Sequence, residues 1–365
     1  MKNLLPPIVV LPNPLSPCKG VPAFSGIADA ASLAGQVAGA LDRFSAFSGP
    51  QMREVSLCAA LAPLEQLESL SVGRLDSIGG EEFAAKSLVQ QYFRIRTADL
   101  DSAQASAHAI GVLVRSLDDL RSAPLAGASA TRETAAIRQV LIDQGAHGDA
   151  ALVDESGPPG RALPEQTSHH WFARWISAHQ LHALFNVHAA LAIGRAIEEL
   201  HEHDVETATV HIRRATVYVN GFSAARAHAL ALPTSFYNDV LRPSMAPPLT
   251  SAPLSGRMHL EYKAYRSQIS RLLTAVPLDI GELAEDEPEL AFAREALLEA
   301  DLIDSESHVC LVEPVVGHAK SLIQNAGSKG YALSILRGIR DRRAADMRTF
   351  VRDGQLPADG RVKRR

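Results

Sequence analysis

Hydrophobic residues recur every three to four positions along most of the chain, which is the spacing of helices that bury one face. The periodic stretches are rich in Ala, Leu, Glu, Gln and Arg, residues that favour helix. Strand-like alternation is almost absent, and its nearest case, residues 207–212, lies inside a helical pattern. The pattern therefore predicts a nearly all-α fold. The predicted helices span residues 28–46, 51–71, 80–95, 103–121, 130–145, 165–202, 205–230, 236–242, 258–274, 290–301, 305–325 and 331–351.

Prolines and glycines divide these helices into regions. Residues 1–26 carry six prolines and are predicted to form an extended arm that lies across the body of the protein. A loop rich in glycine and proline at residues 154–160 separates a small helical region from a longer one. The predicted organisation is therefore an arm at 1–26, a small helical region at 27–153, a larger helical region at 160–352 and a basic tail at 353–365.

Composition narrows the class of protein. The chain is 46% hydrophobic and 21% charged, with a formal net charge of -5 and scattered lysines and arginines. These values predict a soluble globular protein and argue against nucleic acid as a partner. The longest apolar stretch, 183–197, contains Asn186, His188 and Arg195, so it is predicted to be a buried helix and not a membrane span. Three widely spaced cysteines fit a reducing compartment, and we expect a cytoplasmic protein.

His318 is the first candidate functional residue. Valines recur before it at helical spacing, so His318 is predicted to lie on or beside the apolar face of a late helix that bends or restarts at Pro314. Gly317 would let a large flat group approach the backbone. A neutral imidazole on an apolar wall is the environment that an iron porphyrin needs for an axial ligand. Taken alone, the same pattern also describes an ordinary core histidine.

Arg242 is the second candidate. It follows Tyr237 on a short helix between proline breaks, so its guanidinium is predicted to point with fixed geometry into a cavity, where it could bind a carboxylate. The alternative is an arginine that pairs with Asp239 at the helix end. A glycine turn at residues 327–330 could bring backbone N–H groups against a ligand, or could be a plain helix cap.

The long predicted helix at 165–202 carries several histidines, and its apolar side indicates that His182 and His188 face the interior beside Phe185. The single ExxH pair near residue 200 has no partner pair, which argues against a di-iron site. The chain also lacks HExxH, GxSxG, GxGxxG and a phosphate-binding loop. The sequence therefore carries no motif that would predict a zincin, a serine hydrolase or a nucleotide-binding protein.

Residues 236–243, 317–320 and 327–336 together resemble segments of the histidine-ligated heme-dependent aromatic oxygenases, the superfamily of indoleamine 2,3-dioxygenase and tryptophan 2,3-dioxygenase. The likeness covers roughly residues 175–345 and is greatest to monodechloroaminopyrrolnitrin synthase. It implies a multi-helix bundle that encloses a heme, with residues 160–352 as the heme-binding catalytic region.

The resemblance also implies roles for individual residues. His318 would be the heme ligand with Gly317 beside it, Arg242 would hold the substrate carboxylate, and Tyr237 would flank the substrate ring. Heme b would be bound noncovalently, because no CxxCH motif is present, and O2 would be the co-substrate. The remaining implied site residues are Gly327, Ser328 and Gly330 over the substrate, and Phe185, His182, His188 and Phe236 in the pocket wall.

The implied function is a heme-dependent, O2-using oxygenase of tryptophan or a halogenated tryptophan in secondary metabolism. Lys329 stands where the superfamily usually has a second glycine, which leaves ring cleavage, hydroxylation and rearrangement open. One alternative is a heme-dependent hydroxylase of a tyrosine-like amino acid. Another is a helical ligand-binding protein without heme. The sequence leaves a homodimer open as the assembly.

Overall fold

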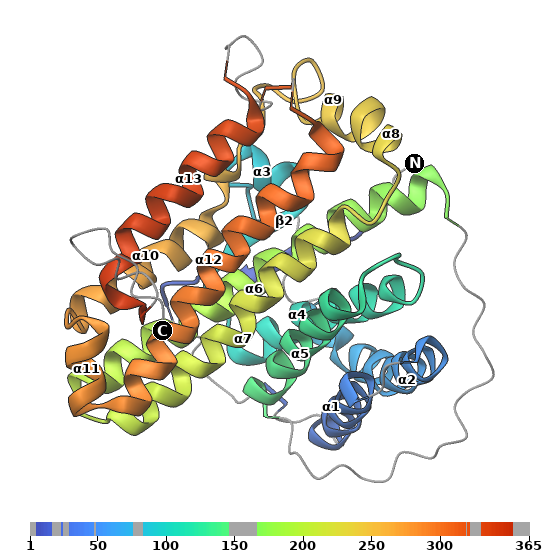
Figure 1. The fold of residues 1–365 in the computed structure, drawn as a ribbon. Coiled ribbons are helices and arrows are strands. Elements are labelled where there is room, and N and C mark those ends of the chain that lie inside the picture. The colour runs from blue at the N-terminus through green and yellow to red at the C-terminus, as the bar shows by residue number, and fades with distance from the viewer. Residues whose placement is uncertain are drawn as a thin grey trace.

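The computed structural model describes residues 5–16, 23–24, 29–46, 49–75, 83–145, 166–318, 320–321 and 330–352. These residues form an almost entirely helical protein, which confirms the predicted fold class (Figure 1). The helices are α1 (Ala30–Ala46), α2 (Pro50–Leu75), α3 (Leu88–Tyr92), α4 (Ser102–Leu120), α5 (Gly127–Asp143), α6 (Ser168–His201), α7 (Val205–Ala229), α8 (Thr234–Phe236), α9 (Arg242–Ser244), α10 (Leu260–Ala275), α11 (Ile280–Asp286), α12 (Pro288–Val316) and α13 (Ala332–Met347). A short π-helix (Tyr237–Leu241) joins α8 to α9, and short 3-10 helices span Gly256–Met258 and Arg348–Phe350.

The long helices α6 and α7 lie side by side through the middle of the molecule (Figure 1). Helix α10 packs on α6, while α12 packs on α7. One hydrophobic core runs from Val9 to Val351, so the two predicted helical regions share it. Close packing at its centre requires a glycine: a Cβ on Gly221 would lie 2.7 Å from the Cβ of Ala136 and 2.9 Å from the ring of Phe185. Among the described residues, no helix is long and apolar enough to cross a membrane.

A small parallel sheet differs from the sequence prediction. Strand β1 (Val9–Pro12), in the predicted arm, pairs in parallel with β2 (Ile95–Ala98). Residues of β1 are buried on both faces, so the strand carries no apolar–polar alternation that would reveal it. The helix predicted at 80–95 is much shorter, because Ser87 caps α3 and Arg94, at φ +56°, turns the chain into β2.

Helix α12 also differs from its prediction. The sequence predicted two helices with a break at residues 301–305, but α12 runs unbroken from Pro288 to Val316. Asp301 and Asp304 do not end the helix, because both carboxylates are buried and paired with arginines on other elements. Pro314 lies in the last turn without stopping it. The helix ends at Gly317, whose φ of +72° lies in a region that residues with a side chain rarely adopt.

A buried charge network holds α4, α5, α6 and α7 together. Asp119 on α4 accepts hydrogen bonds from Arg174 Nε at 2.8 Å, from His170 Nε2 at 2.7 Å and from His228 Nε2 at 2.8 Å. The other ring nitrogen of His228 donates to Glu133 at 2.8 Å. Although burial opposes the charged form, these carboxylates raise the pKa of His228 to about 10. His228 is therefore a cation between two anions at neutral pH.

Candidate functional site

Four histidines from three separate elements gather in the interior, on the side of α6 that faces α10 and α12. His179 and His182 come from α6, His259 directly precedes α10, and His308 lies on α12. Burial lowers the pKa of His179 to about 3, that of His259 to about 4 and that of His308 to about 3, while that of His182 also falls well below its usual value. The positive charge of Arg226 contributes to each shift. All four imidazoles are therefore neutral at pH 7, so each has one unprotonated ring nitrogen; in His182 the Asn186 amide lies within hydrogen-bond distance of the ring nitrogens.

Two side-chain hydrogen bonds show the direction in which α10 and α12 run past each other. Arg294 on α12 donates to the carbonyl of Val276, just after α10, at 2.9 Å. Tyr265 on α10 donates to Asp301 on α12 at 2.9 Å. The residue numbers rise on one helix as they fall on the other, so α10 and α12 run antiparallel. Continuing both helices by about two turns brings His259 and His308 to the same level.

The rings of His259 and His308 face an internal space. Both side chains are partly buried and keep accessible surface, 13% in the case of the His259 side chain. Within the described part of the chain, His308 forms no hydrogen bond. An enclosed side chain whose polar atoms stay accessible and unbonded has room beside it for a ligand.

Aromatic rings form the adjoining wall. Phe93, between α3 and β2, stacks on His179 with ring centroids 4.0 Å apart, and the Trp175 ring lies 4.2 Å from the same histidine. Tyr237 extends this row, 5.8 Å beyond Trp175. His179 Nδ1 donates to the backbone carbonyl of Trp175 at 2.7 Å, which leaves its Nε2 unprotonated. Phe93 and His179 are stacked in parallel, while Trp175 and Tyr237 are tilted, so the wall is an aromatic and largely apolar surface against which a ring can pack.

Two arginines supply positive charge beside the histidines. Arg226 on α7 pairs with Asp304, and Arg343 on α13 bonds to Asp301, Ser305 and Tyr262. Both guanidiniums depress the pKa of His308 after burial, so both lie within electrostatic range of that ring. Cations at this position could bind the carboxylates of a ligand held between the histidines.

These residues fit a heme. The neutral imidazoles could supply nitrogen ligands to its iron, the aromatic side chains an apolar surface, and Arg226 and Arg343 positive charge for its propionates. Neither cysteine for which the structure describes a side chain faces this space: Cys58 bonds to Glu54 on α2, and Cys310 is exposed. Among the described residues, no three His, Cys, Asp or Glu side chains are grouped to chelate a bare metal ion. A macrocycle that brings its own four nitrogens needs no such group.

The structure places Arg242, Tyr237 and Phe236 next to this site. Tyr237 joins the aromatic row, and Phe236 packs on Trp171 with centroids 5.3 Å apart. Burial raises the pKa of Tyr237, and the neighbouring Arg242 partly offsets that rise. Arg242 Nη2 donates to the carbonyl of Ser321 at 2.5 Å, so the pairing with Asp239 that the sequence left open is not formed.

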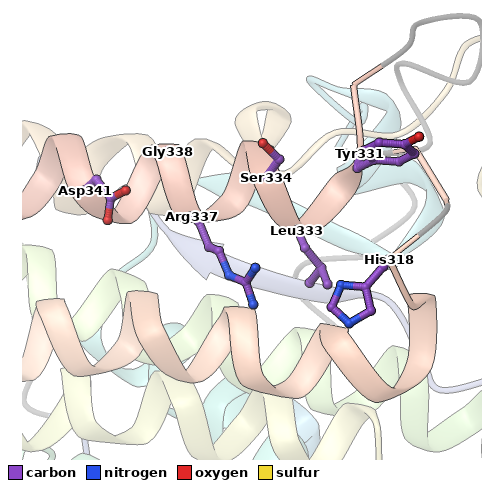
Figure 2. Close-up of a pocket in the computed structure, with 7 residues that line it drawn as sticks. All are labelled: His318, Tyr331, Leu333, Ser334, Arg337, Gly338 and Asp341. Carbon is purple, nitrogen blue, oxygen red and sulfur yellow. The ribbon is translucent and has the colours of Figure 1, made fainter.

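His318 has a different environment from the predicted one. It lies beyond the end of α12, its side chain is 75% exposed, and its Nε2 is 3.4 Å from Glu313. Figure 2 shows it at an open surface pocket between the end of α12 and α13. The expectation of a buried histidine on an apolar wall is wrong, because the positive φ of Gly317 ends the helix and turns the chain outward. A Cβ on Gly317 would meet nothing within 4 Å, so this glycine makes no close approach to other described residues.

Only some of the other predicted pocket residues lie at this site. His182 belongs to the histidine group, whereas Phe185 and His188 pack against α7: the Phe185 ring contacts Gly221, and the His188 ring lies 5.2 Å from Tyr218. Of the glycine turn, Gly330 lies just before α13, and Gly327 and Ser328 fall outside the described residues.

Sequence reasoning missed His179, His259 and His308 as site residues. The three belong to separate helices, and no local motif connects them. Their only signal is that each lies in a helical, partly apolar stretch, which many structural histidines share. The packing of α10 on α6 and of α12 on α7 brings them together.

Comparisons with known proteins identify a family and a similar fold. Residues 11–293 match the family model of the SfmD 3-methyl-L-tyrosine peroxygenases. The fold is similar to a crystal structure of SfmD reduced by soaking with sodium hydrosulfite, with a TM-score of 0.52 and 16% sequence identity over 83% of this chain and 98% of that chain. No curated protein matches the sequence.

The fold and the match together define an oxidoreductase of a heme-dependent class, which confirms that part of the sequence-based interpretation. The chain belongs to the SfmD 3-methyl-L-tyrosine peroxygenase family. The likeness to the pyrrolnitrin enzyme finds no support in the comparisons, and neither does tryptophan as substrate. The family match ends at residue 293, so His308 enters the site through its geometry alone.

Proposed function

We propose that this protein hydroxylates the ring of a tyrosine-like L-amino acid, such as 3-methyl-L-tyrosine, with a peroxide as the oxygen donor. The observation that carries the proposal is the gathering of partly buried, neutral imidazoles at His179, His259 and His308 beside aromatic side chains. The family match supplies the substrate class and the oxidant, which favours the hydroxylase alternative over an O2-using tryptophan oxygenase. When bound, heme supplies the activation of the peroxide oxygen.

In this proposal His259 and His308 would hold the heme through its iron, and Arg226 and Arg343 would pair with its propionates. Burial keeps the two imidazoles neutral at pH 7, so no proton has to leave before they bind iron. Noncovalent attachment remains our expectation, because Cys310 lies on the exposed side of α12.

The substrate is proposed to lie along the row from Arg242 to the histidines. Arg242 binds its carboxylate, and Tyr237 and Trp175 hold its ring at the inner end of the row. Fixing both ends of the amino acid places one ring carbon beside the reactive centre, and this positioning supplies much of the rate. The buried aromatic side chains also exclude water from the reacting ring.

The proposal is tested with purified protein reconstituted with hemin. We expect peroxide to drive conversion of 3-methyl-L-tyrosine to a product that carries one added oxygen, with the label appearing from ¹⁸O-peroxide and not from ¹⁸O2. Tyrosine should react more slowly and tryptophan should be unchanged. Conversion of tryptophan with incorporation from O2, or protein that binds no hemin, would contradict the proposal.

Arg242→Ala is expected to raise KM for the amino acid by roughly 10- to 100-fold, because a charge-assisted bond to a carboxylate contributes about 1.5–3 kcal/mol. Steady-state kinetics measure the change. Arg337→Ala, at a half-exposed arginine beside His318, is the matched control and should leave KM unaltered. A substrate analogue without the carboxylate should bind the wild type and Arg242→Ala equally; a large difference for that analogue would assign Arg242 a structural role.

A further inference from the structure

Glu261 is a buried carboxylate that the surrounding protein satisfies on one side only. It lies in the first turn of α10 and is 1% exposed. Its Oε1 accepts hydrogen bonds from Gln90 Nε2 at 3.0 Å and from Thr97 Oγ1 at 3.4 Å. Its Oε2 has no hydrogen-bond partner among the described residues. Leaving a buried carboxylate oxygen unpaired costs free energy, so its retention needs a reason.

The group nearest to that unpaired oxygen is His259. The distance from Oε2 to His259 Nδ1 is 3.9 Å, which is too long for a hydrogen bond but short enough that a small rotation of either side chain closes it. No arginine or lysine in the described part of the chain pairs with Glu261. The N-terminus of α10 stabilises the negative charge in its place. The carboxylate therefore directs its free oxygen at one imidazole nitrogen.

We propose that Glu261 is a positioning residue for His259: its Oε2 accepts a hydrogen bond from Nδ1 and so keeps Nε2 unprotonated and directed away from Glu261, toward the interior space. The inference rests on the proposed function, in which that space holds heme. Histidines that bind metals usually donate their second ring N–H to such a partner, which fixes the tautomer and increases the basicity of the ligating nitrogen.

The two facing histidines are then chemically different. His259 has an anionic partner on its far nitrogen, whereas His308 has no hydrogen-bond partner within the ranges that the structure describes. A third ring, His179, donates to a neutral backbone carbonyl. The His259 nitrogen is thus the strongest electron donor of the group, and it stabilises the oxidised form of a bound iron more than His308 does.

The test compares Glu261→Gln and Glu261→Asp in hemin-loaded protein by absorption spectroscopy, heme titration and redox titration. We expect Glu261→Gln to raise the midpoint potential and to weaken heme binding by about 10- to 100-fold. Glu261→Asp keeps the charge and should recover part of both properties. Glu133→Gln is the matched control, since Glu133 is fully buried, bonds to a histidine and has one oxygen without a hydrogen bond in the described part of the protein. It should lower stability without moving the potential.

Nitrogen NMR of ¹⁵N-histidine-labelled full-length protein without heme separates this inference from the proposed function. His259 should be protonated at Nδ1 in the wild type and should become a mixture of tautomers in Glu261→Gln. If the tautomer depends on Glu261 in a protein that binds no heme, the proposed function fails and the positioning role stands. If neither the tautomer nor the potential responds to Glu261→Gln, the inference is overturned.

Discussion

His308→Ala is expected to remove or strongly shift the Soret band of hemin-loaded protein and to abolish peroxide-driven turnover. The physical reason is that His308 offers a neutral, partly buried imidazole with no hydrogen bond to any described residue. Removing it leaves the heme with at most one protein ligand on the other side. Absorption spectra and hemin titration measure the loss, and circular dichroism establishes that the variant remains folded.

His318→Ala is the control that decides between the structure and the sequence-based prediction. Its side chain is 75% exposed and contacts Glu313, so we expect an unchanged spectrum and unchanged heme affinity. If His318→Ala lost the heme spectrum and His308→Ala kept it, His318 would be the heme ligand. The proposed site would then be wrong.

Asp119→Asn is expected to have the largest effect on stability. The substitution leaves Arg174 and the His228 cation without their shared anion in a mostly buried position. Breaking such a pair costs about 3–5 kcal/mol. Urea unfolding followed by circular dichroism measures the change. Asp118→Asn is the matched control, because its carboxylate is 37% exposed and its pairing with Arg121 should contribute less than about 1 kcal/mol.

The same network gives a pH dependence whose sign follows from His228. Its pKa is about 10 in the folded protein, against the ordinary histidine value of 6.5 that applies to the unfolded chain, so its contribution to stability is complete below pH 6.5. That contribution is lost as pH rises toward 10. We expect wild-type stability to fall over this window and Asp119→Asn to fall less steeply. Equal slopes for both proteins would show that His228 is not held as a cation.

The long helices could be predicted from sequence because each carries its own periodic apolar face. Helices α6 and α7 differ from their predicted ranges by only a few residues at their ends. Strands β1 and β2 could not be predicted, since they are four residues long and pair across most of the first hundred positions. The predicted break in α12 was wrong because two aspartates that resemble a helix boundary are buried with arginine partners.

The site was only partly predictable for a similar reason. Arg242 and Tyr237 lie on one short helical segment, where local sequence fixes their relation to each other. The relative position of His259 and His308 depends on how α10 and α12 run past each other. No local sequence pattern encodes that arrangement. The valines before His318 predicted a position on or beside an apolar helix face. Its actual orientation depends on the backbone of Gly317, which turns the side chain into solvent.

The unbroken course of α12 constrains how this family member can change over evolution. Asp301, Asp304 and His308 lie on one face of that helix, within about 10 Å along its axis. A single inserted or deleted residue between Asp304 and His308 would rotate the histidine by about 100° while the two aspartates stayed with their arginines. Length changes are therefore tolerable in the loops around the helix. Within this segment they would move His308 out of the proposed heme site although the rest of the fold stayed intact.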